Sequence, residues 1–326
     1  MKNVAKKPLI ASGIAALAVL FGACAPMASG PEAPMGRTMY ATTQDNRMAK
    51  FGSQNPSNSV TFVTFTGLAA GETMIGLDFG PRDGKLYAVS NQNRIYTVDT
   101  TTGATIAIGA SAFAPALIGA SFGLDFNPTV NRIRVHSDAD FNVRLNQETG
   151  MVVDSDAVTA GVQADLNLNY NAGDAGAGTN PSVVATAYTN SNATATTTTL
   201  FAIDSSRDVL VTVAPPNDGK LTTVGSLGVD TSAAAGFDIS GASDGTAFAT
   251  LTSATGVSSL YTINLTTGQA TLLGAVGSNL TLTGVAIAPE TPASHRTARA
   301  FGSGSFCLDQ AAPQRFDRRL STIRHR

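Results

Sequence analysis

Short runs of β-branched and aromatic residues, separated by turn residues, fill the chain between residues 38 and 289. In the clearest unit, Leu86–Ser90 and Arg94–Asp99 are rich in such residues, and Asn91–Asn93 separates them as in a hairpin. Two shorter apolar runs flank this hairpin: Gly76–Phe79 and Ala104–Ile108. The unit, Gly76–Gly109, therefore predicts four short strands.

Several of these strands lack alternation of polar and apolar positions, which is typical of sheets covered on both faces. A four-stranded sheet needs similar neighbours to bury two faces, and the sequence supplies them. Gly123–Pro128 repeats the start of the unit, and Gly236–Ile239 starts another copy. The late segment Tyr261–Gly268 closely matches Tyr96–Gly103.

The repeat predicts an all-β fold, a β-propeller of about five four-stranded blades. A degenerate copy begins near Val183, with Leu200–Asp204 expected as its third strand. The last start, Gly284–Pro289, lacks following strands, whereas Thr38–Phe65 offers three strands without an opening one. Pairing these two ends completes one blade and closes the ring. An open all-β array or a sandwich is the alternative.

Charge is distributed unevenly along the chain. The formal net charge is −2, but residues 31–292 hold 11 Lys and Arg against 21 Asp and Glu, a formal charge of −10. Phosphate contacts need a basic face, so nucleic acid is an unexpected partner. The two cysteines, Cys24 and Cys307, lie outside the repeats and indicate neither a disulfide framework nor a cysteine metal site.

The N-terminus indicates export. Residues 1–23 combine an early lysine cluster with a short apolar run, Ile10–Phe21, as in a signal peptide. Leu20–Cys24 resembles a bacterial lipoprotein signal, which predicts lipidation of Cys24, although Phe21 stands where Leu is preferred. Simple secretion after ordinary cleavage and an uncleaved anchor are the alternatives. Localisation is therefore expected to be a membrane-anchored lipoprotein, or else secreted or periplasmic.

Composition divides the remainder into three parts. Residues 24–36 are rich in Pro, Ala and Gly and predict a flexible tether, and residues 37–292 form the propeller domain. Within it, Asp154–Pro181 departs from the blade pattern, and Thr189–Thr199 predicts a long hairpin loop. Residues 293–326 are basic and predict a disordered tail, for which weak anchoring to anionic surfaces is the functional alternative.

The repeated GLDF starts, together with the Gly-rich stretch of Tyr170–Tyr188, resemble an uncharacterised bacterial family called domain of unknown function 4394. The resemblance runs from about Thr38 to Pro289 and is most specific in Gly76–Gly103 and Gly123–Gly150. It implies exported propeller-type repeats. It implies no activity and no catalytic residues.

Asp78, Asp125 and Asp238 occupy the same place in three first strands, which line the central channel of a propeller. Three inward carboxylates form a candidate site for a hard cation such as Ca²⁺. Alternatively, each aspartate accepts hydrogen bonds from backbone N–H groups of an adjacent turn. The corresponding position in the last start is Ala286, which weakens a ring-shaped site.

Other candidate residues give weaker patterns. Asp138, Asp140 and Asn142 have the spacing that begins a calcium loop, but Val143 stands where glycine is required. Asp154 and Asp156 form an acidic pair, although sequence cannot place them at a glycosidase separation.

His136 is the one histidine in the repeats, and no nucleophile-elbow motif accompanies it. A structural role is therefore expected for this side chain, and no catalytic residue is assigned.

The sequence favours a non-enzymatic binding or scaffold propeller of the cell envelope. The alternative is an exported hydrolase or lyase that uses carboxylates or a metal on glycans or lactones. The expected partners are an unknown envelope or extracellular ligand and, through the lipid, a membrane. The protein is expected to be a monomer that needs no cofactor.

Overall fold

A computed structural model of the chain describes residues 30–290 and confirms the all-β prediction. Its one helical element there is the 3₁₀ turn η1 (Pro216–Asp218). No helix within this described range has the length and apolarity needed to cross a membrane. The predicted export signal, Cys24 and the tail at 293–326 lie outside the described residues.

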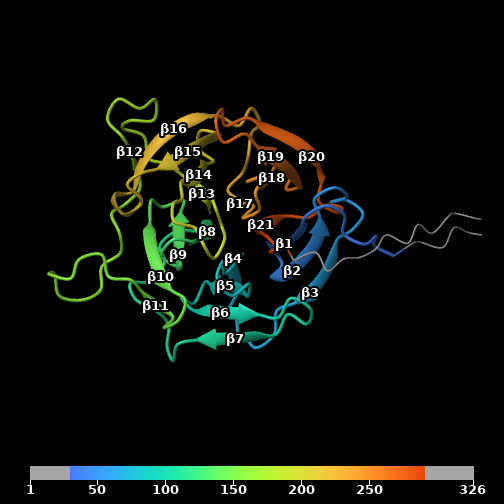
Figure 1. Ribbon diagram of the computed structural model, residues 1–326, viewed down its shortest axis with the longest axis horizontal. Coiled ribbons are helices and arrows are strands. Elements are labelled where there is room, and N and C mark those ends of the chain that lie inside the picture. The colour runs from blue at the N-terminus through green and yellow to red at the C-terminus, as the bar shows by residue number, and fades with distance from the viewer. Residues whose placement is uncertain (1–29, 291–326) are drawn as a thin grey trace, which may run out of the picture. The chain divides into compact units, whose positions relative to one another are not determined.

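Five antiparallel sheets form the blades of a ring (Figure 1). Blade 1 contains β21 (Leu282–Ile287), β1 (Thr38–Thr43), β2 (Arg47–Gly52) and β3 (Thr61–Thr64). Blade 2 contains β4 (Met74–Phe79), β5 (Leu86–Ser90), β6 (Ile95–Val98) and β7 (Thr105–Ile108). Blade 3 contains β8 (Phe122–Asn127), β9 (Arg132–Ser137), β10 (Asn142–Asn146) and β11 (Met151–Val152).

The other two blades complete the ring. Blade 4 contains β13 (Val183–Tyr188), β14 (Leu200–Asp204), β15 (Val209–Val213) and β16 (Lys220–Ser226), with β12 (Asn169–Tyr170) added in parallel to β16. Blade 5 contains β17 (Ala235–Ile239), β18 (Ala247–Thr252), β19 (Ser258–Ile263) and β20 (Ala270–Ala275). The first strand of each blade faces the centre, and these inner strands contact one another in the order β4, β8, β13, β17, β21 and back to β4.

The ring closes as predicted, because strands from opposite ends of the chain share blade 1. β1 pairs antiparallel with β21, with Tyr40 opposite Ala286. The N–H of Ala288 donates to the carbonyl of Thr38 at 2.9 Å, and the Thr283 hydroxyl donates to the Thr42 hydroxyl at 3.0 Å. These bonds give β1 a partner on both sides and make β21 the inner strand of a complete four-stranded blade.

Burial on both sheet faces explains why the strands lack polar alternation. All residues of β5, β13, β14, β17 and β18 are buried. Aromatic side chains fill the seams between blades: Tyr40 of blade 1 meets Phe79 of blade 2 with ring centroids 5.5 Å apart, and Tyr87 meets Phe126 at 5.1 Å. Both pairs are edge-to-face, a favoured geometry for aromatic rings.

The turn between the third and fourth strands follows directly from the repeated Asp/Asn-x-x-x-Gly pattern. Asp99 Oδ1 accepts hydrogen bonds from the N–H groups of Thr101 and Thr102, at 2.9 and 2.8 Å. Gly103 closes this turn with φ of 75° and approaches blade 1 so closely that a Cβ would lie 2.2 Å from the Thr64 carbonyl oxygen. Glycine is therefore required both for its backbone conformation and for blade contact.

Two expectations need correction. Leu200–Asp204 is β14, which pairs directly with the inner strand β13 and is therefore the second strand of blade 4 and not the third. The tether predicted over 24–36 is held on the ring from Glu32 onward: the Glu32 N–H donates to the Asn58 carbonyl, and the Met35 N–H donates to Asn55 Oδ1. The departure over Asp154–Pro181 and the loop over Thr189–Thr199 lie where predicted, outside the four regular strands of each blade.

Closure generates a stability prediction. Deleting residues 35–67 should destabilise all blades, because β21 would lose its partner and both neighbouring seams would open. Calorimetry should show a lower midpoint and a broader transition than for the full chain. As the matched control, shortening the exposed turn 157–161 should leave the transition almost unchanged. A deletion variant that melts as high and as sharply as the full chain would contradict the role of closure.

Candidate functional site

Three inner strands bring their aspartates together in the channel. Asp78 on β4, Asp125 on β8 and Asp238 on β17 are buried, and one carboxylate oxygen from each lies within 4.8 Å of the others. We call these residues the channel acids. Their convergence follows from the repeat, since each stands two residues after the glycine that begins the strand motif.

Each channel acid bonds the next inner strand of the ring. Asp78 Oδ2 accepts from the Phe126 N–H at 2.9 Å, and Asp125 Oδ1 accepts from the Tyr188 N–H at 3.2 Å. Asp238 Oδ2 accepts from the Ile287 N–H at 2.6 Å. The donors belong to strands of the neighbouring blade, whereas the sequence analysis considered an adjacent turn. The three carboxyl groups thus connect blade 2 to 3, blade 3 to 4 and blade 5 to 1.

Alanine takes the equivalent position in the other two inner strands. Ala187 pairs with Phe201 and Ala286 with Tyr40, in the same register in which Asp78 pairs with Tyr87. An aspartate at position 187 would bond the N–H of Ile239, and one at position 286 would bond the N–H of Phe79.

Both amides instead bond the channel acid that precedes them in their own strand. The Phe79 N–H donates to Asp78 Oδ1 at 2.7 Å, and the Ile239 N–H bonds Asp238. The ring therefore satisfies these buried amides with three aspartates.

Burial governs the electrostatics of the channel acids. Desolvation raises the pKa of Asp78 and Asp125 well above the usual range, and the negative charges of neighbouring channel acids raise both further. Desolvation also raises the pKa of Asp238 to about 6, against the effect of its backbone hydrogen bonds. The channel acids therefore bind protons at a higher pH than exposed aspartates do.

The channel acids offer an incomplete donor set for a metal. Oxygen atoms within 4.8 Å of one another can share one Ca²⁺, whose oxygen ligands lie at about 2.3–2.6 Å. Calcium takes about 6–8 oxygen ligands. The three carboxyl groups already accept backbone hydrogen bonds, and both oxygens of Asp78 are used in this way. The calcium prediction stays a prediction.

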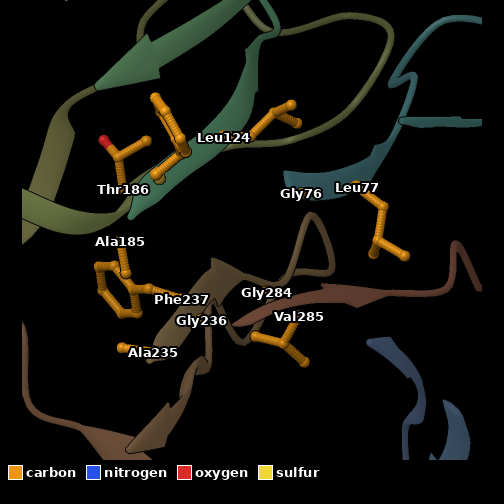
Figure 2. Close-up of a pocket in the computed structure, with 12 residues that line it drawn as sticks. Gly76, Leu77, Leu124, Ala185, Thr186, Ala235, Gly236, Phe237, Gly284 and Val285 are labelled. Atoms are coloured by element: carbon orange, nitrogen blue, oxygen red, sulfur yellow. The ribbon is translucent and has the colours of Figure 1, made fainter. Parts of the chain in front are cut away.

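Beside the channel acids the inner strands approach one another through glycines (Figure 2). A Cβ on Gly123 would lie 2.6 Å from the Thr186 nitrogen, and one on Gly236 would lie 2.5 Å from the Val285 nitrogen. The remaining cavity has a volume of about 10 Å³, which is room for about one water molecule. The channel is therefore closed to a substrate at this level.

A larger cavity lies where the inner strands begin; we call it the mouth. Its volume is about 310 Å³. It is lined by Thr43, Gln44, Asn46, Thr73, Met74, Ile75, Ala120, Ser121, Phe122, Ala233, Ala234 and Thr283. None of these lining residues, all within the described ring, has a titratable side chain.

Hydrogen bonds fix the loops that form the mouth. Asn46, in the β1–β2 turn, donates to the Glu72 carbonyl at 3.3 Å and accepts from the Met74 N–H at 2.9 Å. The buried Glu72 carboxylate accepts from the Ser90 and Tyr96 hydroxyls. Burial raises the pKa of Glu72, but these bonds outweigh it and leave the pKa lowered.

The same device recurs around the ring. Asn93, in the β5–β6 turn, accepts from the Leu117 N–H at 2.9 Å, and Asp208, in the β14–β15 turn, accepts from the Thr231 N–H at 2.8 Å. Asn46, Asn93 and Asp208 all have positive φ, between 51° and 59°. Asn and Asp tolerate this conformation better than most residues. The mouth is therefore pre-formed.

His136 lies on β9 opposite Gly123 and is fully buried. Within residues 30–290, neither of its ring nitrogens has a partner at hydrogen-bond geometry. Burial, followed by the Arg134 charge, holds the pKa of His136 well below its usual range. A neutral, enclosed imidazole of this kind gives no catalytic triad.

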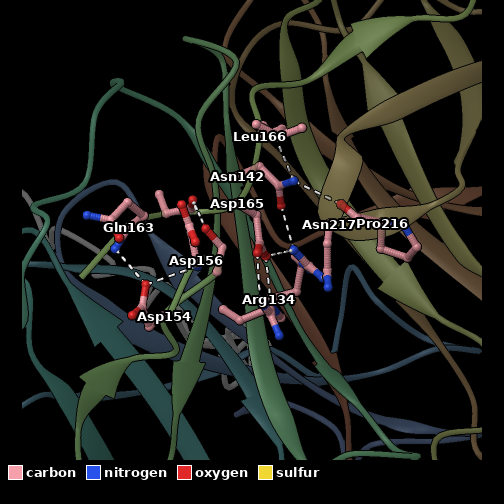
Figure 3. Close-up of polar contacts among 12 residues, drawn as sticks. Arg134, Asn142, Asp154, Asp156, Gln163, Asp165, Leu166, Pro216 and Asn217 are labelled. Atoms are coloured by element: carbon pink, nitrogen blue, oxygen red, sulfur yellow. Dashed lines mark hydrogen bonds and ion pairs between the residues drawn. The ribbon is translucent and has the colours of Figure 1, made fainter. Parts of the chain in front are cut away.

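The other acidic candidates are used locally. Asp138 accepts from the Ala120 N–H at 2.8 Å, and Asn142 Oδ1 accepts from Arg134 at 2.7 Å. These bonds occupy two of the three groups proposed to begin a calcium loop. Asp154 accepts from the N–H groups of Asp156 and Gln163 and so closes an exposed turn (Figure 3).

A buried ion network joins blades 3 and 4 (Figure 3). Arg134 Nη1 lies 2.6 Å from Asp165 Oδ2, and Arg144 Nη2 lies 2.7 Å from Asp165 Oδ1. Arg134 also donates to Asn217 at 2.7 Å and to the Tyr188 hydroxyl at 3.3 Å. Asp165 comes from the long segment between β11 and β13, so this network fastens that segment to the ring.

The family assignment rests on residues 47–286, over which the chain matches the domain of unknown function DUF4394. The chain belongs to this family. No curated protein matches it.

Solved structures show distant likeness. A chain of a nidogen/laminin complex is 11% identical, with a TM-score of 0.46 over 78% of this chain and 98% of that one. A protein of unknown function from Bacteroides thetaiotaomicron VPI-5482 is 14% identical, with a TM-score of 0.44 over 78% of this chain and 64% of that one. These similarities say nothing about the activity of the DUF4394 domain.

The mouth is not predicted from the sequence. Its residues come from the β1–β2 hairpin, from the loops before β4, β8 and β17, and from the starts of β4, β8 and β21, and they are neutral, so no motif marks them. Asn46 carries the one detectable signal, a residue suited to positive φ in a short turn between two strands.

The channel acids predict an unusual pH dependence. A carboxyl group whose pKa is higher in the folded protein than in the unfolded chain stabilises the fold fully at pH values below its unfolded pKa of 3.8. This stabilisation is lost as the pH rises through the pKa of the folded state. For Asp238 the shift to about 6 corresponds to about 3 kcal/mol of unfolding free energy. Asp238→Asn keeps an acceptor for the Ile287 N–H, so the variant should gain stability relative to wild type between pH 4 and 8.

Urea denaturation across that pH range measures this difference. Asp244→Asn, at an exposed carboxylate paired with Arg37, is the matched control and should show no such gain. A constant difference between wild type and Asp238→Asn at all pH values would contradict the raised pKa.

Proposed function

We propose that this protein is an exported, envelope-attached binding module whose ligand occupies the mouth. The carrying observation is a pre-formed cavity of about 310 Å³ at the open end of the channel. This volume falls at the lower end of the range of about 300–1,000 Å³ that is common for ligand pockets. A pre-formed site loses little conformational entropy on binding.

Binding is favoured over hydrolysis by the position of the acids. A glycosidase places two carboxyl groups on either side of the scissile bond. Here the channel acids are buried, and each bonds the backbone of another blade. The mouth itself contributes neither an acid nor a base from its lining residues.

The sequence supports the cellular setting of the proposal. A lysine-rich start and a short apolar run precede Cys24, as in an exported lipoprotein. The formal charge of −10 over residues 31–292 argues against nucleic acid as the ligand. We therefore propose a monomeric module, attached to a membrane by lipid, that binds an envelope or extracellular ligand without a cofactor.

Filling the mouth should abolish binding. Ala233 lines the mouth and is exposed, so Ala233→Trp should occupy the cavity without disturbing a blade core. We expect the affinity for soluble envelope extract, measured by calorimetric titration, to fall at least about tenfold. This fall corresponds to a loss of about 1.4 kcal/mol of binding free energy.

Ala157→Trp, in an exposed turn, is the matched control and should bind normally. Time-dependent product formation that Asp125→Asn abolishes would establish the hydrolase or lyase alternative instead. Equal binding by wild type and Ala233→Trp would show that the mouth is not the site.

Lipidation can be tested separately. Cys24→Ser should lose lipid labelling and membrane partition, because acyl chains contribute about 0.8 kcal/mol per buried CH₂. Mass spectrometry of the mature N-terminus measures the modification directly. An unmodified N-terminal peptide that begins beyond Cys24 would indicate ordinary secretion.

A further inference from the structure

The chemistry of the mouth restricts the class of its ligand. Because its lining has no titratable group, the mouth offers no opposite charge to a charged ligand that loses its water on binding. Burying an unpaired charge is far more costly than burying a polar group that finds a hydrogen bond. The mouth therefore selects against both anions and cations.

The polar groups of the mouth divide into two sets. Thr43, Asn46 and Thr283 already bond within the protein: the Thr43 hydroxyl to Asp45, the Asn46 amide to Glu72, and the Thr283 hydroxyl to Thr42. Within residues 30–290, no hydrogen bond uses the side-chain amide of Gln44 or the hydroxyls of Thr73 and Ser121. These three groups come from different loops and are available to a ligand as donors and acceptors.

Apolar side chains form the other part of the lining. Met74 is buried, while Ile75 and Phe122 are partly exposed at the start of β4 and β8. Ala233 and Ala234 add small apolar contacts from the loop before β17. A suitable ligand thus has one face for apolar contact and several hydroxyl or amide groups at its edge.

We infer that the mouth binds an uncharged, polyhydroxylated ring, that is, a neutral sugar or the neutral end of a glycan. The ring carbons contact Phe122 and its apolar neighbours, and the ring hydroxyls bond Gln44, Thr73 and Ser121. This inference rests on the proposed function, because it names the ligand class of the same cavity.

Matched sugars test the charge dependence directly. Glucose, glucosamine and glucuronate share one ring but carry zero, positive and negative charge, and galactose, galactosamine and galacturonate form a second series. Titration of the full protein by saturation-transfer NMR should give binding to at least one neutral sugar. The charged members of that series should bind at least about tenfold more weakly.

Two variants of mouth residues and one control variant locate the site. Ala233→Trp should abolish sugar binding, and Ala157→Trp should preserve it. Ser121→Ala should weaken the neutral sugar several-fold, and it should leave binding of cyclohexanol, a ring with a single hydroxyl, unchanged.

The outcomes separate the two proposals. A charged sugar that binds as tightly as its neutral partner and is lost in Ala233→Trp would overturn the inference and keep the mouth as the binding site. If Ala233→Trp loses binding of the envelope extract but no neutral sugar binds to the wild type, the inference is also overturned and the mouth is kept as the binding site. Binding that persists in Ala233→Trp would overturn the proposed function itself.

Discussion

Each blade of this protein buries both faces of its sheet against its neighbours, and the rest of the structure depends on this packing. β13, β14, β17 and β18 are buried at every residue, which no isolated four-stranded sheet could achieve. An open row of blades would still expose one face at each end. Closure through β1 and β21 completes blade 1 and covers both of these faces.

The same packing explains how the seams between blades are built. In blades 1, 2, 4 and 5, an aromatic residue lies opposite the aspartate or alanine of the inner strand: Tyr40, Tyr87, Phe201 and Phe248. Blade 3 has Arg134 there, opposite Asp125, and its guanidinium reaches the Tyr188 hydroxyl of blade 4. A buried cation needs a buried partner, which Asp165 supplies from outside the blade pattern. The long segment before β13 thus supplies the charge that pairs with this departure from the repeat in β9.

Repetition explains which features the sequence could predict. The blades, the closure and the gathering of Asp78, Asp125 and Asp238 follow from equivalent positions in copies of one unit. In blade 4 the start near Val183 is correct, but the strand number of Leu200–Asp204 is wrong, because the long loop Thr189–Thr199 alone separates β13 from β14 and breaks the spacing of the repeat. The ion network of Arg134 and the mouth could not be predicted, because both depend on loops that the repeat does not specify.

The acidic residues of the ring and the lining of the mouth differ in charge. Formal charge makes the ring strongly acidic, yet the channel acids are enclosed, and Glu72 and Asp165 are buried with their hydrogen-bond partners. Burial and the charges of neighbouring channel acids raise the pKa of Asp78 and Asp125 well above the usual range, so these carboxyl groups bind protons more readily than exposed aspartates do. The cavity open to a ligand is lined by neutral side chains. The formal charge of the ring thus lies away from the mouth lining, and under the proposed function hydrogen bonds and apolar contact would decide which ligand the mouth accepts.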